Sequence, residues 1–399
     1  MRVLVAIGGN ALLRRGEKPD AETQRTNVVV AAAAIAEIAN EHEVIVTHGN
    51  GPQVGMLALE SAADPALTRP YPLDVLGAQT QGMIGYLVGQ ALQNDLPNRQ
   101  VATLVTQTLV STADPAFRTP TKFVGPVYPQ TQARELAAER GWTVRQDGER
   151  WRRVVPSPQP QRVVETRLIR LLLDAGTVVV CAGGGGVPVV RDSESGRLRG
   201  VEAVVDKDLT AALLAEALDA DVLLLVTDVQ AVMIGYGTPD AAEIRHSTSA
   251  RLLAQSFPEG SMGPKVEAAC RFAELTGGMA GIGALDSVAA MLRGESAPWS
   301  RPAGGDRRAA FVVGPRTPPH IRTRAVDRPV PPARRPQRTA RSHRDRASAP
   351  GRRTPPGSGH PAPARSRPAP RVRKPGPSAA GPGTGRRIRG NRTAAASAG

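Results

Sequence analysis

Asp206, Lys207 and Asp208 form a charged triplet between the β-branched run Val204-Val205, which predicts the end of a strand, and an Ala/Leu-rich run, which predicts a helix. In open α/β sheets, ligands bind where strands end and helices begin. We interpret Lys207 as a phosphate ligand and Asp208 as the carboxylate that orients it. The alternative is a capped helix start with a surface ion pair, because Asp is a favoured N-cap residue. Asp206 is the expected structural member of the triplet.

Two further lysines lie in constrained contexts. Lys122 is bracketed by Pro120 and Pro126, and proline restricts the backbone. Lys265 follows a glycine and a proline at an expected helix N-terminus, where free N–H groups attract anions. Phosphoryl transfer needs cations and positioning but no side-chain nucleophile. The three lysines therefore predict a phosphoryl-transfer site, with an ordinary solvated lysine as the alternative for Lys122.

Glycine-rich segments follow three expected strands. They are Gly8-Gly9-Asn10, Gly49-Asn50-Gly51 and the four glycines at 183–186. Backbone N–H groups of such loops can approach an anion closely, although tight turns are the simpler alternative. For the four glycines we favour a backbone surface pressed against a ligand. His48 precedes the second loop, and we expect a structural role for it because no carboxylate partner is evident nearby.

The elements that must position these residues alternate between strand and helix. Apolar runs predict strands at 2–7, 43–47, 101–109, 177–182 and 221–227, and helical spacing predicts helices at 23–39, 76–92, 164–174, 209–218 and 257–272. We expect an α/β fold with a doubly wound, mostly parallel sheet and helices on both faces. Residues 111–160 are rich in proline and charge and predict a small lid with a hairpin around Asp147-Gly148.

Charge divides the chain at about residue 296. Of its 51 Lys and Arg residues, 24 fall in 297–399, together with only three of the 36 acidic residues. Residues 1–296 therefore predict a mildly acidic globular domain, and 297–399 predict a disordered low-complexity tail. The two cysteines have no zinc-ligand spacing, and no signal peptide or membrane span is evident. A cytoplasmic protein with free thiols is expected.

Eight segments, in order, resemble those of carbamate kinases in the amino acid kinase superfamily. They are GGNAL (8–12), HGNGPQVG (48–55), QGMIGY (81–86), PTKFVGP (120–126), GGGGVPV (183–189), VDKDLTAA (205–212), TDV (227–229) and GSMGPKVEAA (260–269). Single pieces are weak signals, but the ordered combination is specific and covers residues 1 to about 296.

The resemblance implies reversible phosphoryl transfer between carbamoyl phosphate and ADP, giving ATP and carbamate, in arginine degradation. Lys122, Lys207 and Lys265 would bind the moving phosphoryl group, and Asp208 would orient the lysines. Carbamoyl phosphate would be held by two sets of loop residues, namely Gly8, Gly9 and Asn10 with Gly49, Asn50 and Gly51. The nucleotide would lie near Asp228, Met262 and Gly263, with Mg²⁺ bridging its phosphates rather than held by protein ligands. A homodimer is implied, with no membrane or specific nucleic-acid partner.

Two departures from the family pattern concern the nucleotide loop and the C-terminus. Gln230 stands where an acidic residue is expected, and the family's final strand is replaced from Ser296 onward by Arg/Pro/Ala/Gly-rich sequence. We interpret 297–399 as a translated shifted reading frame, which resequencing of the coding DNA tests.

Two alternative functions remain. One is an acetylglutamate or uridylate kinase, although those usually carry a lysine beside the first glycines, where Ile7 precedes Gly8 here. The other is a non-enzymatic nucleic-acid binder that acts through the basic tail. The physiological direction of the reaction stays open.

Overall fold

The computed structural model describes residues 1–293, apart from 15, 230–231 and 258–261, together with one strand at Ala310–Gly314. The chain divides into two units, Met1–Ala325 and Val326–Gly399. All of the described residues belong to the first unit. Residues 297–399 are expected to be disordered, and apart from 310–314 they lie outside the described residues.

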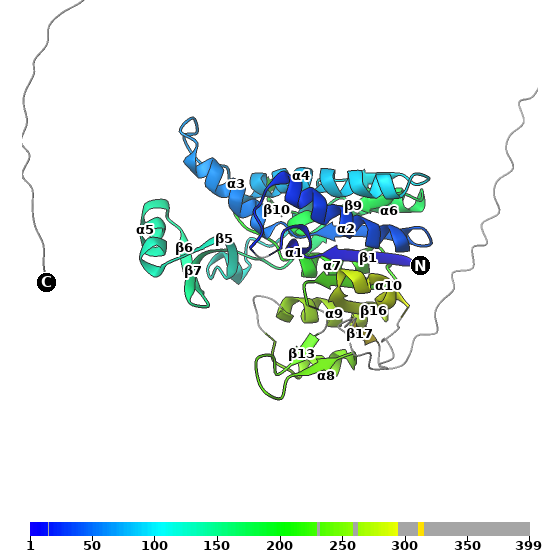
Figure 1. The fold of residues 1–399 in the computed structure, drawn as a ribbon. Coiled ribbons are helices and arrows are strands. Elements are labelled where there is room, and N and C mark those ends of the chain that lie inside the picture. Colours follow the sequence, from blue (N-terminus) through cyan, green and yellow to red (C-terminus); the bar gives the residue numbers. More distant parts are fainter. Residues whose placement is uncertain (15, 230–231, 258–261, 294–309, 315–399) are drawn as a thin grey trace, which may run out of the picture. The chain divides into compact units, whose positions relative to one another are not determined.

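An eight-stranded sheet forms the centre of the first unit (Figure 1). The six strands from β16 to β3 pair in parallel, whereas β17 is antiparallel to β16 and parallel to β15. In spatial order the strands are β15 (His246–Thr248), β17 (Ala310–Gly314), β16 (Met279–Ala284), β12 (Val222–Thr227), β1 (Arg2–Ile7), β2 (Glu43–His48), β9 (Val178–Val180) and β3 (Val101–Thr103).

Successive residues of β1 point to opposite faces of the sheet, and both faces are buried. Val3, Val5 and Ile7 pack in one cluster with α2 (Ala21–Ala39), α4 (Leu73–Asp95) and α10 (Val288–Leu292). Leu4 and Ala6 pack in the other with α6 (Thr166–Asp174), α7 (Lys207–Ala217) and α9 (Met262–Thr276). Strands buried on both sides read as continuous apolar runs. The predicted doubly wound fold is therefore confirmed.

Three smaller sheets surround the central one. A four-stranded sheet contains β11 (Leu198–Gly200), β10 (Val187–Arg191), β4 (Gln107–Leu109) and β8 (Arg162–Val163), and a two-stranded sheet contains β13 (Val232–Ile234) and β14 (Ala242–Ile244). The third contains β5 (Lys122–Tyr128), β7 (Arg150–Val155) and β6 (Thr143–Asp147). With α5 (Gln130–Arg140) it forms the segment that we call the lid, which contacts α3 (Gly51–Ala63) through β5 (Figure 1). The predicted hairpin at Asp147-Gly148 is the β6–β7 turn.

The short helices lie at loops. They are α1 (Gly9–Leu12), α8 (Ser249–Leu253) and the 3-10 turns η1 (Pro115–Phe117), η2 (Gly183–Gly185) and η3 (Leu285–Ser287). None of the helices in the described part of the chain is both long and apolar enough to cross a membrane.

Two predicted strands differ from the structure. The run at 101–109 is two strands in different sheets, because β3 joins β9 while β4 pairs with β10. Val204 and Val205 are not in a strand, since the chain leaves β11 at Gly200 and reaches α7 as irregular backbone. Their apolar side chains pack in small clusters instead of forming a ladder.

A strand lies beyond the predicted domain boundary at residue 296. β17 sits between β15 and β16, within sequence that we interpret as a shifted frame. Its sequence, AFVVG, is a β-favouring island among Arg and Pro. The sequence analysis expects the family's final strand to be lost. The structure instead has a strand at Ala310–Gly314 in the central sheet.

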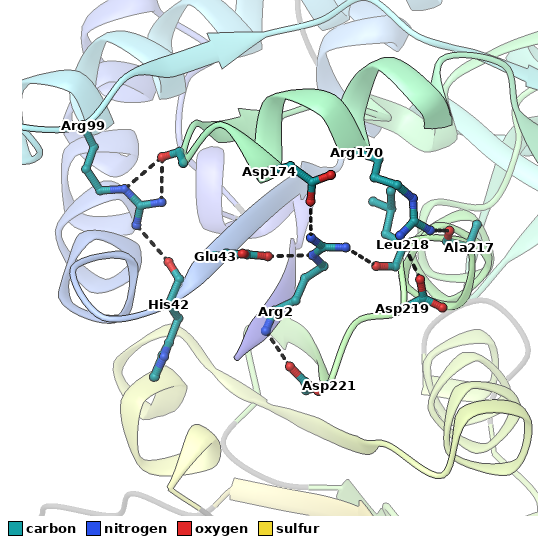
Figure 2. Close-up of polar contacts among 11 residues, drawn as sticks. Arg2, His42, Glu43, Arg99, Arg170, Asp174, Ala217, Leu218, Asp219 and Asp221 are labelled. Atoms are coloured by element: carbon teal, nitrogen blue, oxygen red, sulfur yellow. Dashed lines mark hydrogen bonds and ion pairs between the residues drawn. The ribbon is translucent and has the colours of Figure 1, made fainter. Parts of the chain in front are cut away.

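Arg2 is the first residue of β1, at the opposite end of that strand from the glycine loop, and it ties together several elements. Figure 2 shows its polar contacts. It is 3% exposed, and its guanidinium donates to Glu43 Oε2 at 2.8 Å, Asp174 Oδ1 at 3.1 Å and the Leu218 carbonyl at 2.6 Å. Its backbone N–H donates to Asp221 Oδ2 at 2.6 Å. The guanidinium thus joins β1 to β2, α6 and the end of α7, and the backbone N–H of Arg2 joins it to the residue before β12.

Candidate active site

Asp206 caps α7, as the sequence predicts. Its Oδ1 accepts hydrogen bonds from the backbone N–H groups of Asp208 at 2.9 Å and Leu209 at 3.2 Å. An Asp N-cap satisfies donors that the first turn of a helix leaves without partners. The helix start therefore presents Lys207 and Asp208 in its first turn.

Three lysines from distant parts of the chain meet at this helix start. Lys122 Nζ lies 2.5 Å from Asp206 Oδ2, which the cap leaves available. Lys265 Nζ lies 2.8 Å from Asp208 Oδ2, and Lys207 Nζ contacts Asp208 Oδ1. One lysine comes from the lid, one from α7 and one from α9. The structure thus brings together Lys122, Lys207, Asp208 and Lys265, and adds Asp206.

Burial differs among the lysines. The side chains of Lys207 and Lys265 are 14% and 12% exposed, whereas that of Lys122 is 34% exposed. Buried charges persist only when they are paired. Lys207 and Lys265 share one carboxylate, so Asp208 is the centre of the cluster, while Lys122 reaches the cluster from its solvent side.

The pKa values follow from this arrangement. Burial acts to raise the pKa of Asp208, but Lys207 and Lys265 outweigh it and hold that pKa well below its usual range. Burial lowers the pKa of Lys207 to about 8, against the opposing charge of Asp208. Burial also acts to lower the pKa of Lys265, but Asp208 outweighs it and the pKa is raised. Lys207 is therefore the lysine of the buried pair that loses its proton first as pH rises.

The loops after β1 and β2 touch each other. A Cβ atom on Gly49 would lie 2.6 Å from the Gly9 nitrogen, so any larger residue would push the loops apart. The Gly49 N–H donates to the Ile7 carbonyl at 2.9 Å, and Asn50 Nδ2 donates to Thr80 Oγ1 at 2.8 Å. Gly8 precedes α1, which contains Gly9 and Asn10, and Gly51 begins α3. The six predicted substrate residues thus belong to two adjoining loops at the carboxyl ends of β1 and β2.

The four glycines at 183–186 pack against protein rather than facing only a ligand. A Cβ on Gly183 would lie 2.3 Å from the His48 ring, and one on Gly184 would lie 2.2 Å from Asn50 Nδ2. Gly185 similarly approaches the Val205 carbonyl, which precedes the cap residue Asp206. The sequence interpretation, a backbone surface pressed against a ligand, did not include these protein neighbours. The absence of side chains at these glycines makes room for His48 and Asn50 at the end of β2 and for the backbone of Val205 before α7.

His48 is neutral and enclosed. Burial lowers its pKa to about 4, and its Nδ1 lies 3.0 Å from the Gly49 carbonyl oxygen. This environment agrees with the structural role favoured from the sequence.

The predicted nucleotide residues lie on two elements next to the lysines. Asp228 directly follows β12 and is exposed, with the Thr227 hydroxyl 3.2 Å from its Oδ1. Met262 and Gly263 begin α9, one turn before Lys265. Gln230 and residues 258–261 lie outside the described residues.

Sequence reasoning missed the contact between Lys122 and Asp206, which are 84 residues apart. The available signal was the cap itself. A helix cap uses one oxygen of Asp206 and leaves the other free to accept a cation.

Known proteins resemble this chain in sequence over most of its length. Residues 1–280 match the amino acid kinase family. A carbamate kinase of Rhizobium meliloti is 55% identical over 297 residues, which cover 74% of this chain and 91% of the relative. A carbamate kinase of Haemophilus influenzae is 50% identical over 297 residues, covering 74% and 95%.

Solved structures give the same result. Carbamate kinase from Giardia lamblia bound to AMP-PNP has a TM-score of 0.69 and 39% identity, and the match covers 79% of this chain and 98% of that one. A protein from Aeropyrum pernix K1 has a TM-score of 0.70 and 38% identity, with coverage of 79% and 100%.

Proposed function

The chain belongs to the amino acid kinase family and, within it, to the carbamate kinases, and on this premise we propose that the lysine cluster at the start of α7 is its phosphoryl-transfer centre. The reaction is reversible phosphoryl transfer between carbamoyl phosphate and ADP, giving ATP and carbamate, which decomposes to ammonia and carbon dioxide. Catabolic ATP formation linked to arginine degradation is the proposed role.

The observation that carries the proposal is the convergence of Lys122, Lys207 and Lys265 on two carboxylates. Charge develops on the oxygens of the phosphoryl group as it moves, and preorganised cations stabilise that charge. Asp208 fixes the two buried ammonium groups, so little reorganisation is needed when the reaction begins. The anchored lysines and the excess of positive over negative charge among the five side chains suit a phosphate ligand.

No side chain has to move a proton in this reaction. The attacking group is a phosphate oxygen of ADP, which is already anionic, and the leaving group departs as carbamate. Phosphoryl transfer of this kind depends on positioning and charge. The burial and low pKa of His48 support a structural role for that residue.

We propose that the substrates approach from opposite sides of the lysines. Gly8, Gly9, Asn10, Gly49, Asn50 and Gly51 would hold carbamoyl phosphate, because their two loops adjoin at the ends of β1 and β2. Asp228, Met262 and Gly263 would contact the nucleotide, because β12, which Asp228 follows, and α9, which begins at Met262, both pack against α7.

Mg²⁺ would enter with the nucleotide. Within the described part of the chain, no three His, Cys, Asp or Glu side chains converge on a metal site, and Asp206 and Asp208 are engaged by lysines. Mg²⁺ is commonly held by substrate phosphates and water with few protein ligands, which suits this arrangement. We also propose a homodimer and a cytoplasmic location from family membership.

ATP formation from carbamoyl phosphate and ADP tests the proposal. Lys207→Ala is expected to lower kcat by about 100-fold or more, the cost of removing a preorganised donor. The exposed Lys18→Ala serves as the charge-matched control and should leave kcat unchanged. Assays of N-acetylglutamate and UMP with ATP separate the related kinases. Near-normal turnover in folded Lys207→Ala protein would contradict the assignment.

A further inference from the structure

Helix α3 and the first strand of the lid, β5, meet at a pair of glycines. A Cβ atom on Gly55 would lie 2.4 Å from the Gly125 Cα and 2.7 Å from the Gly125 nitrogen. Real Cβ atoms do not approach backbone this closely, so even alanine at position 55 requires β5 to move. The contact is asymmetric, because a Cβ on Gly125 would lie 3.9 Å from the Gly55 Cα, an ordinary van der Waals distance.

The glycine contact sits within an apolar seam between the lid and the core. Val54 of α3 packs with Val124 of β5 and Val155 of β7, together with Leu73 and Leu76 of α4. Gly125 has a φ of +71° and lies where the register of β5 against β7 shifts. Its carbonyl accepts a hydrogen bond from Arg152 Nε at 2.7 Å, which fixes the bulge from the lid side.

The same seam reaches both members of the Lys122–Asp206 pair. Lys122 opens β5 three residues before Gly125 and pairs with Val155 in the β5–β7 ladder. Val204, two residues before Asp206, packs on the seam, and its N–H donates to the Pro156 carbonyl at 2.9 Å. A shift of β5 on α3 would therefore move Lys122 relative to Asp206.

We propose that Gly55 is a positioning residue for catalysis, because its lack of a side chain lets β5 seat where Lys122 reaches the phosphoryl site. The inference rests on the proposed catalytic role of Lys122. It assigns Gly55 no contact with substrate. Gly55 acts through Lys122, which lies on the lid strand that Gly55 contacts.

A double-mutant cycle tests this dependence in the full chain. Gly55→Ala is expected to lower kcat for ATP formation by about 100-fold, since a displacement of about 1 Å at a reacting centre can cost that much. In a Lys122→Ala background the same substitution should change kcat by less than about 2-fold, because the lysine it displaces is gone. A general structural role would instead lower kcat by the same factor in both backgrounds.

Two alanine controls separate steric displacement from other effects of replacing glycine. Gly125→Ala adds a methyl group at the same contact without a clash, so it should lower the melting temperature through its positive φ but lower kcat much less than Gly55→Ala does. Gly82→Ala lies at an exposed position inside α4, where an added Cβ would meet no atom outside its own helix within 4 Å, so it should raise the melting temperature slightly and leave kcat unchanged. If Gly55→Ala does not fold, Val124→Ala loosens the same seam without a clash and should show the same dependence on Lys122.

The outcomes distinguish the two proposals. If Lys122→Ala retains near-normal kcat, the proposed role of Lys122 fails, and with it the premise of this inference. If Lys122→Ala is impaired but Gly55→Ala is active, or the two effects multiply, only the positioning role of Gly55 is overturned.

Discussion

Asp206→Asn separates the two functions that the structure gives to one carboxylate. Oδ1 caps α7, and Oδ2 holds the Lys122 ammonium at 2.5 Å. Asparagine caps helices about as well as aspartate. It has no negative charge for Lys122, however, and its amide group would face the ammonium with a donor. From sequence alone Asp206 is expected to matter mainly for stability, whereas the structure predicts a second effect on turnover.

The magnitudes follow from burial. Retaining the cap should keep the stability loss of Asp206→Asn below that of Asp206→Ala by about 1 kcal/mol, the usual value of an N-cap. Lys122 is 34% exposed and Asp206 11%, so the pair lies between a surface pair of 0–1 kcal/mol and a buried one. Release of Lys122 should therefore raise the activation free energy by about 1.4–2.7 kcal/mol, a 10- to 100-fold loss in kcat.

The assay is ATP formation from carbamoyl phosphate and ADP, together with urea unfolding of each variant. Asp206→Asn should show low kcat with stability near that of the unaltered protein, and Asp206→Ala should show both losses. Lys122→Ala should match Asp206→Asn in kcat, and the double variant should be no worse. Full turnover in folded Asp206→Asn, with Lys122→Ala impaired, would refute the claim that Asp206 positions Lys122.

Three further predictions concern pH, the Arg2 cluster and the C-terminus. Lys207 must be charged to bind phosphate and its pKa is about 8, so kcat/KM should fall as pH rises through 8. Asp208→Asn removes the charge that raises this pKa and should move the fall in kcat/KM to lower pH. An unchanged pH profile in Asp208→Asn would contradict the assignment. Arg2→Met should lower the free energy of unfolding in urea by about 2–3 kcal/mol, because the Leu218 carbonyl loses its buried donor while Glu43 and Asp174 remain half-exposed to water, with kcat unchanged. A chain ending at Ala325 should keep full activity. A chain ending at residue 296 lacks β17, so its free energy of unfolding should fall by roughly 1 kcal/mol for each ladder hydrogen bond removed. Equal melting temperatures of the two truncated chains would show that β17 is dispensable.

The central fold could be predicted from the sequence because its signals are local. β1 is six buried residues, RVLVAI, and its neighbours β2 and β12 contain the apolar runs VIV and VLLLV. Helical spacing predicts α2, α4 and α6 to within a few residues of their bounds. Asp206 is likewise a local signal, since a cap needs only the backbone two and three residues ahead. The prediction of a single strand at 101–109 was wrong, because hydrophobic periodicity does not reveal that the chain passes from one sheet to another there.

The candidate site depended on contacts between distant residues. The sequence supplied three lysines in constrained contexts and the glycines that follow strands. Only the tertiary structure shows Asp206 paired with Lys122, the glycines at 183–186 packed on His48 and Asn50, and Gly55 against Gly125.

The same limit applies at the C-terminus. The island at 310–314 has the composition of a strand, but its short length is outweighed by the Arg- and Pro-rich residues around it. Its place between β15 and β16 comes from the sheet, which offers unpaired backbone on both sides. The sequence by itself determined which residues can carry charge, form strands and bend, because these properties belong to each residue and its neighbours. The tertiary structure decided which of them meet, because burial and pairing across dozens of residues depend on the whole chain.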